Sequence, residues 1–231
     1  MRAALLAGVV ALLSGCAGAQ AQQARRDFQV GAFDRIDLAG SPDVVVAVGG
    51  QPSVRAEGDS DTIERLEIAV VEGELRIGMR RGSGTWGGHR GVTVHVTVPA
   101  LSAAAISGSG DMRIDRVDGA RFAGQITGSG DLAVTALRVG EASFAVRGSG
   151  DISAAGAASR ATLSLTGSGG LALAGFEAGD AAVSLAGSGD IALRAMRTAA
   201  IQLNGSGDIN IAGPARCTIA KSGSGEVNCG G

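Results

Sequence analysis

Apolar and polar residues alternate through the second half of the chain, around a Gly-Ser-Gly tripeptide that recurs every 18 to 20 residues. The tripeptides begin at Gly108, Gly128, Gly148, Gly167, Gly187, Gly205 and Gly223. Alternation with a period of two is typical of a β-strand with one buried face. A regular repeat indicates a solenoid, in which each coil buries its apolar side against its neighbours. Because 18 to 20 residues are too few for two helices and their turns, the pattern predicts the coils of a parallel β-helix.

The inward-facing positions follow from the alternation. Counted from the first glycine of each tripeptide, positions −4, −2, +4 and +6 carry most of the apolar side chains. Position +6 is occupied by Ile114, Val134, Ala154, Leu173, Leu193, Ile211 and Cys229. The last coil departs from the pattern, because Lys221 stands at position −2, which is apolar in every earlier coil. We therefore expect the core to open to solvent at this end.

The tripeptide itself is expected to form the corner between two strands. Glycine adopts the positive φ angles that such a corner often requires and that other residues resist. Neighbouring coils lie about 4.8 Å apart, so the serine and the following aspartate should form two ladders along one edge of the molecule. The predicted corner ladders contain Ser109, Asp111, Ser129, Asp131, Ser149, Asp151, Ser188, Asp190, Ser206 and Asp208.

The aspartate ladder needs a stabilising partner, because two carboxylates about 5 Å apart repel by roughly 1 kcal/mol in water. One interpretation is that each carboxylate accepts hydrogen bonds from backbone amides of the turn. The other is a column of divalent cations such as calcium. Gly170 interrupts the column, and the spacing differs from the shorter glycine-rich repeat of calcium-binding β-rolls. We therefore favour the hydrogen bonds and predict no metal and no other cofactor.

Residues 27–101 lack the regular Gly-Ser-Gly period but keep the strand pattern. Val92 to Val98 alternate strictly, two short strands flank Glu72-Gly73-Glu74, and Asp59 to Arg65 read as one helical turn. Terminal repeats must cover an otherwise open core, so we expect wider coils and a cap in 27–101 and regular coils in 102–231. Together they predict one all-β domain, 27–231, a single-stranded parallel β-helix (β-solenoid) with Gly-Ser-Gly-Asp corners. It should be right-handed, because parallel crossovers almost always are.

The first residues form a separate unit that resembles an export signal. A basic Arg2 precedes an apolar stretch from Ala3 to Leu13, which is too short to span a bilayer. The sequence Leu-Ser-Gly-Cys ending at Cys16 resembles a bacterial lipobox, whose cysteine is lipidated. We expect a signal peptide at 1–19 and a linker at 20–26; ordinary cleavage after Ala19 or Ala21 is the alternative. Either way we expect export, as an outer-membrane or periplasmic lipoprotein or as a soluble periplasmic or secreted protein.

Cys217 and Cys229 are the two cysteines that follow the signal segment. In an oxidising compartment such a pair favours a disulfide over two buried thiols. They lie at positions −6 and +6 around Gly223, so both share the parity of the inward-facing set. We predict that a disulfide closes the last coil.

Composition offers little support for catalysis or for nucleic-acid binding. The net charge is −2 and no basic cluster is present, which argues against nucleic acid. The two histidines, His89 in a glycine-rich loop and His95 on the polar side of a strand, have no evident partners for a metal or catalytic site. Asp115, Arg113, Arg138 and Arg194 are the charges that a polysaccharide-cleaving β-helix could use, but their spacing does not require this.

The order of segments in the mature chain resembles one known family. The stretch from Phe33 to Gly49, the paired strands around Gly73, the tryptophan loop and the serial Gly-Ser-Gly-Asp coils are similar to the auto-transporter adhesin head GIN domain family. The resemblance implies a parallel β-helix in a secreted or membrane-attached bacterial protein, with no established activity. It implies no catalytic residue that could be transferred to this chain.

Three classes of function therefore remain open. A non-catalytic, adhesin-like surface module that binds an envelope glycan or a surface protein fits the export signal and the decorated ladders. A structural envelope protein fits nearly as well, and a polysaccharide-binding or polysaccharide-cleaving enzyme fits the fold alone. We expect no enzyme activity, no nucleic acid, and contact with the membrane only through a lipid anchor.

Overall fold

The computed structural model describes residues 23–80 and 91–230. These residues form a β-solenoid of about six turns, which confirms the predicted all-β fold class. Right-handed winding stays a prediction. The expected signal peptide at 1–19, Cys16 and His89 lie outside the described residues.

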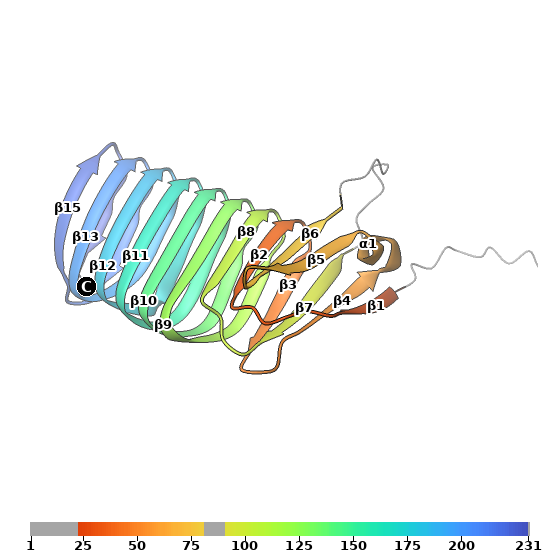
Figure 1. The fold of residues 1–231 in the computed structure, drawn as a ribbon. Helices are drawn as coiled ribbons and strands as arrows, with labels where there is room; N and C mark the ends of the chain where they lie inside the picture. The colour runs from red at the N-terminus through yellow and green to blue at the C-terminus, as the bar shows by residue number, and fades with distance from the viewer. Residues whose placement is uncertain (1–22, 81–90, 231) are drawn as a thin grey trace, which may run out of the picture.

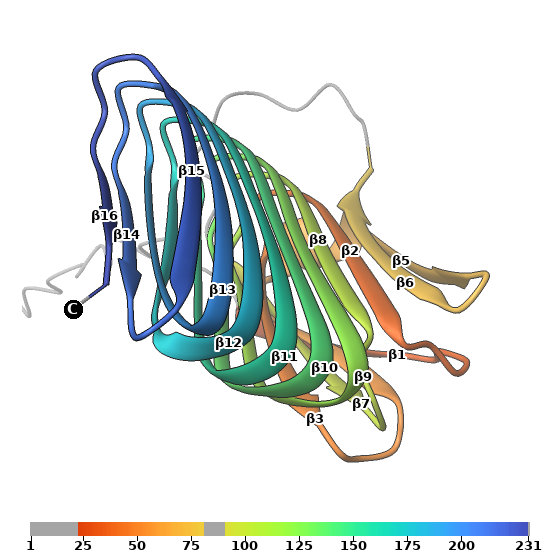
Figure 2. The ribbon, with the colours of Figure 1, turned by 90° about the vertical axis from the view of Figure 1, so that its left-hand side faces the viewer.

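Five long strands make up the regular coils: β9 (Met112–Gly128), β10 (Leu132–Gly148), β11 (Asp151–Gly167), β12 (Gly170–Gly187) and β13 (Asp190–Gly205). Each pairs in parallel with the next coil. Each also bends near its middle, so that its two halves belong to two facing layers (Figure 2). The first half of β9 pairs with β3 (Asp43–Val48), and its second half pairs with β8 (Ala103–Gly108). The last turn is split into β14 (Ile209–Ala212), β15 (Arg216–Ser222) and β16 (Val227–Cys229).

The N-terminal third mixes parallel coils with antiparallel additions. β2 (Arg35–Gly40) and β7 (Val92–Val98) continue the two layers in parallel. β1 (Gln23–Phe28) and β4 (Ser53–Asp59) extend one layer antiparallel, and β5 (Leu66–Val71) forms a hairpin with β6 (Glu74–Met79). The one described helix is α1 (Ser60–Glu64).

The predicted elements of this region are present, with one difference at the start. The helical turn, the hairpin around Gly73 and the strand Val92–Val98 all occur where the sequence predicts them. The segment expected to be a linker, 20–26, overlaps β1, which begins at Gln23 and pairs with β4. Its charged side chains gave no apolar alternation, because β1 is an edge strand whose side chains remain mostly exposed.

The core lies between the two layers and is built from the inward-facing positions. Leu173 is fully buried, and its counterparts in the neighbouring coils are also buried. Phe122, Phe144 and Phe176 stack edge to face near the bend, with ring centroids 6.2 and 6.0 Å apart. In the last coil Lys221 is exposed, as expected of a core that opens to solvent.

Candidate binding surface

The predicted corner residues lie between consecutive strands, and the glycines allow the coils to approach closely. The first glycine of every tripeptide has a positive φ; that of Gly148 is 133°. The second glycine has no such requirement but is buried against the preceding coil. A Cβ on Gly150, for example, would overlap the carbonyl oxygen of Gly130. Both glycines are therefore needed for the backbones to stack.

The corner aspartates are linked to one another through the backbone. The carboxylate of Asp111 accepts a hydrogen bond from the amide of Asp131 at 3.0 Å, and Asp131 accepts one from Asp151 at 2.9 Å. Asp190 and Asp208 repeat the arrangement toward Glu226 in the last coils. A charged acceptor contributes about 1.5–3 kcal/mol to such a bond, which offsets the repulsion within the ladder. These contacts are of the kind that the hydrogen-bond interpretation requires, although they join neighbouring coils rather than residues of one turn.

Gly170 interrupts the ladder as the sequence indicates, and the backbone compensates. The amide of Asp190 donates to the carbonyl oxygen of Gly169 at 3.3 Å, where a carboxylate would otherwise accept. The corner serines form their own row: the amide of Ser129 donates to Gly108, and the equivalent bond recurs at Ser149, Ser168, Ser188 and Ser206. Within residues 23–80 and 91–230, no three His, Cys, Asp or Glu side chains are grouped so as to hold a metal ion.

The aspartate ladder begins one member earlier than predicted, at Asp43 in the coil before Asp111. The carboxylate of Asp43 accepts a hydrogen bond from the amide of Asp111 at 3.2 Å. Asp43 ends a Gly-Ser-Pro-Asp segment, in which Gly40 also has a positive φ, of 110°. This variant of the tetrapeptide, with proline in place of the second glycine, was the signal available in the sequence.

One layer presents short and almost entirely uncharged side chains to solvent, and we call it the neutral face. It consists of β8, the second halves of β9 to β13, and β15, and Figure 1 looks onto it. Its three rows contain Ala103, Ala123, Ser143, Thr162, Ala182, Ala200 and Thr218; Ala105, Gln125, Ala145, Ser164, Ser184, Gln202 and Ala220; and Ser107, Thr127, Arg147, Thr166, Ala186, Asn204 and Ser222. Arg147 is the charged member of these rows.

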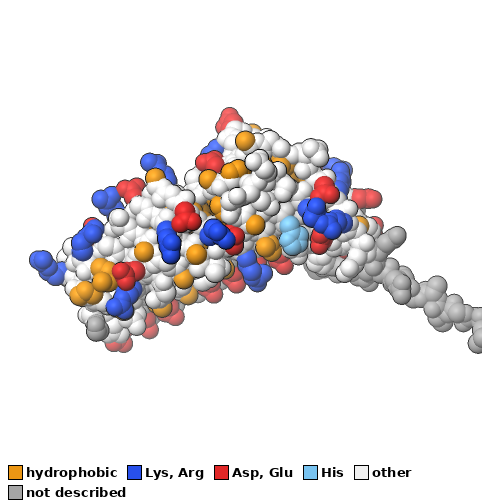
Figure 3. Space-filling model, turned by 90° about the horizontal axis from the view of Figure 1, so that it is seen from below, with side chains coloured by type: hydrophobic (Ala, Val, Ile, Leu, Met, Phe, Trp, Pro, Cys, Tyr) orange, Lys and Arg blue, Asp and Glu red, His pale blue; other side chains and the backbone are white. Residues whose placement is uncertain are grey.

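The bend in the long strands has the opposite character, and we call it the charged bend. Successive coils stack Arg121, Glu141, Arg160, Asp180 and Thr198 in register. A guanidinium nitrogen of Arg160 lies 2.7 Å from Glu141. Figure 3 views this side of the molecule and shows basic and acidic side chains interspersed along it. Each acid of the stack is therefore paired with one arginine, Glu141 with Arg160 and Asp180 with Arg197.

Asp180 is the carboxylate whose titration this stacking changes most among the described residues. Hydrogen bonds from Arg197, at 2.6 Å, and from Thr198, at 2.8 Å, lower the pKa of Asp180 from 3.8 to about 2. The cause is stabilisation of the charged form by donors on the next coil. This is an ion pair between an exposed arginine and a half-buried carboxylate, typical of a structural contact on a solvated edge.

The charges that could serve polysaccharide cleavage do not converge. Arg113 and Asp115 point outward from the first half of β9, in the layer opposite the neutral face. Arg138 and Arg194 lie near the bend on β10 and β13, three coils and therefore about 14 Å apart. His95 is exposed on β7. The structure therefore does not bring these residues together in one site.

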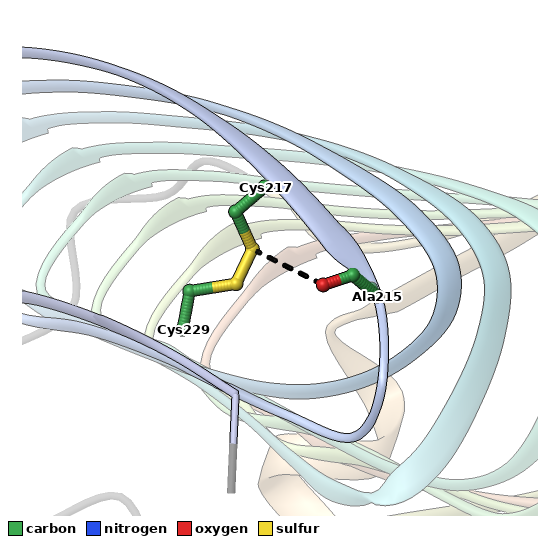
Figure 4. Close-up of a disulfide and its surroundings, with 3 residues drawn as sticks. All are labelled: Ala215, Cys217 and Cys229. Atoms are coloured by element: carbon green, nitrogen blue, oxygen red, sulfur yellow. Dashed lines mark hydrogen bonds between the residues drawn. A yellow bond between two sulfur atoms is a disulfide. The ribbon is translucent and has the colours of Figure 1, made fainter.

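Cys217 and Cys229 meet at the open end of the solenoid. Their Cα atoms lie 6.5 Å apart, and the structure joins their sulfur atoms in a disulfide (Figure 4). This separation is within the range of natural disulfides. The pair connects β15 to β16, which come from opposite layers of the last coil.

The outer surface thus offers a neutral face and a charged bend, and the chain as a whole resembles known proteins. The model of a family described as "Putative auto-transporter adhesin, head GIN domain" matches residues 32–215. No curated protein matches the chain. In the described part of the chain, no helix has the length and apolar character needed to cross a membrane.

Solved structures show the same fold. The chain is similar to a "putative adhesin" from Bacteroides fragilis, with 21% identity, a TM-score of 0.86, and coverage of 90% of this chain and 97% of the other. It is also similar to a "putative lipid binding protein" from Parabacteroides distasonis, with 21% identity, a TM-score of 0.70, and coverage of 89% and 96%. At this level of identity the likeness establishes the fold alone.

Proposed function

Since the chain belongs to the auto-transporter adhesin head GIN domain family, which indicates an adhesin-like role at the cell surface, we propose that it is a non-catalytic module that binds an envelope glycan chain along its neutral face. The observation that carries this proposal is the neutral face itself. Its rows combine serine, threonine, glutamine and asparagine with alanine over seven adjacent strands, and Arg147 is their one charged member.

The dimensions of the neutral face favour a linear polymer over a globular partner. Seven strands spaced about 4.8 Å apart give a length of about 30 Å, and five residues along each strand give a width of about 15 Å. The area is therefore about half of the roughly 800 Å² that each partner buries in a standard protein interface. A polymer chain lying along the rows can use the whole length of such a strip.

The chemistry of the face also suits a ligand rich in hydroxyl groups. Short side chains lose little rotamer freedom when they are covered, and uncharged groups cost less to desolvate than charged ones. Each hydrogen bond contributes about 0.5–1.5 kcal/mol net. We therefore expect a dissociation constant on the order of micromolar to millimolar for a short oligomer, and tighter apparent binding for a long chain that engages several modules.

A binding screen tests the proposal directly. The exported protein would be applied to immobilised peptidoglycan fragments, lipopolysaccharide and plant uronic-acid polymers, with and without calcium, and bound protein would be measured. We expect saturable binding to at least one polysaccharide that calcium does not change. Binding to none of these polymers would contradict the proposal, and release of unsaturated sugars would instead indicate a cleaving enzyme.

We also propose that the module is held at the envelope by a lipid on Cys16, because a short apolar segment ending in Leu-Ser-Gly-Cys resembles a lipobox. Cys16→Ser should release the protein from the membrane fraction into the soluble periplasmic fraction. A wild-type protein that is already soluble and begins at Gln20 or Gln22 would show ordinary signal cleavage instead.

A further inference from the structure

A hollow lies where the neutral face meets the charged bend. It has a volume of about 240 Å³ and is lined by residues of β9, β10 and β11 and by Ser102, which directly precedes β8. Arg121 stands on one side, the buried ring of Phe122 contributes to its lining, and Ser143 and Thr162 bring hydroxyl groups from the first row of the neutral face. The volume is below the roughly 300–1,000 Å³ of a drug-sized pocket, so we expect it to accept one small group.

Arg121 is the basic group of this hollow that has no acidic partner among the described residues. Its neighbour in register is Glu141, but that carboxylate lies 2.7 Å from a guanidinium nitrogen of Arg160 on the far side. The other acid nearby, Asp34, accepts a hydrogen bond from Ser102 at 2.8 Å and lies 3.8 Å from Arg35. Each acid around the hollow therefore has its own cation, and the hollow retains one spare positive charge.

We propose that this hollow binds the carboxylate of an acidic sugar within a glycan chain that lies on the neutral face. A guanidinium presents two parallel N–H donors that match a carboxylate, and such bidentate, charge-assisted bonds are among the strong hydrogen bonds of proteins. The hydroxyls of Ser143 and Thr162 can donate to or accept from the hydroxyls of the same sugar. The inference rests on the proposed function, because the neutral face holds the remainder of the chain.

The test compares two forms of one polymer on matched variants. A short oligogalacturonate and its methyl-esterified form differ only at the carboxyl group of each sugar, which is ionised in the first and a neutral methyl ester in the second, and their affinities would be measured by calorimetry. Arg121→Gln removes the guanidinium from the hollow. Arg138→Gln removes the same charge from the bend outside the hollow, and both residues are exposed, so both variants should fold.

We expect the wild type to bind the acidic oligomer more tightly than the ester. Arg121→Gln should reduce affinity for the acidic form at least about tenfold, in line with the loss of a charged hydrogen bond, and leave affinity for the ester within twofold. Arg138→Gln should change neither by more than about twofold. Equal losses in the two variants would show long-range attraction only and would overturn the proposal, as would no effect of Arg121→Gln or no binding of either oligomer.

The two proposals fail in different ways. If the ester binds and Ser184→Arg on the neutral face abolishes that binding, the proposed function stands whatever Arg121→Gln does. If the acidic oligomer needs Arg121 but Ser184→Arg has no effect on either oligomer, the hollow binds a carboxylate without the neutral face. A sulfated oligosaccharide, measured in parallel, separates recognition of carboxylate from recognition of any anion.

Discussion

Replacing Gly150 by alanine tests the physical basis of the stacked corners. The backbone of Gly150 lies outside the left-handed region that favours glycine, so alanine meets no conformational strain of its own there. The added Cβ would instead overlap the carbonyl oxygen of Gly130 and come within 3.0 Å of the side chain of Ile126. Because the obstacle is backbone, the two coils have to separate locally.

The cost follows from what that separation breaks. The amides of Ser149 and Gly150 donate to Gly128 at 2.9 and 3.2 Å, and each such bond contributes about 0.5–1.5 kcal/mol. Overpacking of a close-packed site adds typically about 1–3 kcal/mol. We therefore expect the free energy of unfolding to fall by about 4 kcal/mol, and the melting temperature by roughly 8–16 °C for a domain of this size.

The assay is thermal and urea unfolding followed by far-ultraviolet circular dichroism. Gly119→Ala is the matched control, because Gly119 is also in a coil, but a Cβ there meets nothing within 4 Å. Its stability should stay within about 0.5 kcal/mol of the wild type or rise slightly. Equal melting temperatures for Gly150→Ala and Gly119→Ala would refute the argument that the corner glycines are required for close approach of the coils.

Four further predictions concern the ladder, the disulfide, the bend and the core. Asp131→Ala should destabilise the protein by about 1–2 kcal/mol, whereas Asn, which keeps an acceptor and removes repulsion, should match the wild type in urea unfolding without calcium; equal loss in both would contradict this. Mass spectrometry of the non-reduced exported protein should find Cys217 and Cys229 linked, and two free thiols would end that proposal. The lowered pKa of Asp180 contributes stability above its unfolded value of 3.8 that is lost as pH falls toward about 2. Between neutral pH and about pH 2, the wild type should therefore lose more stability than Asp180→Asn. Parallel profiles of stability against pH would contradict the lowered pKa of Asp180. Leu173→Asp should unfold the domain because it buries an unpaired charge, and an unchanged melting temperature would show that the inward register is wrong.

The coils could be predicted because each one is a local pattern repeated along the chain. The period-two alternation predicted which side chains face inward. The opening of the core followed from one departure from that pattern, Lys221 at a position that is apolar in every earlier coil. The bend in the middle of each long strand carries no comparable signal, since the pairing there follows no single rule: it shifts register between Leu173 and Glu177 in β12 but runs without a shift between β9 and β10. Without the bend, the outward positions could not be divided between two layers, and the neutral face could not be recognised.

The N-terminal cap was less predictable for a different reason. The antiparallel pairing of β1 with β4 joins residues that are distant in sequence, and nothing in the charged segment around Arg25 and Arg26 shows a strand by itself. The first corner was not predicted either, because Pro42 replaces the second glycine of the Gly-Ser-Gly-Asp motif. The hollow at Arg121 depends on which acid pairs with Arg160, and spacing along the chain does not show that.

The most direct test of binding along the neutral face is a pair of variants on opposite layers. Ser184→Arg places a long charged side chain in the middle row of the neutral face, and Ser153→Arg places the same side chain on the opposite layer of the neighbouring coil. Affinity would be measured on the polysaccharide that the wild type binds most tightly in the screen. We predict that Ser184→Arg weakens binding at least about tenfold while Ser153→Arg stays within twofold, which corresponds to less than about 0.5 kcal/mol. Equal affinities in the two variants, or a larger loss with Ser153→Arg, would contradict the account.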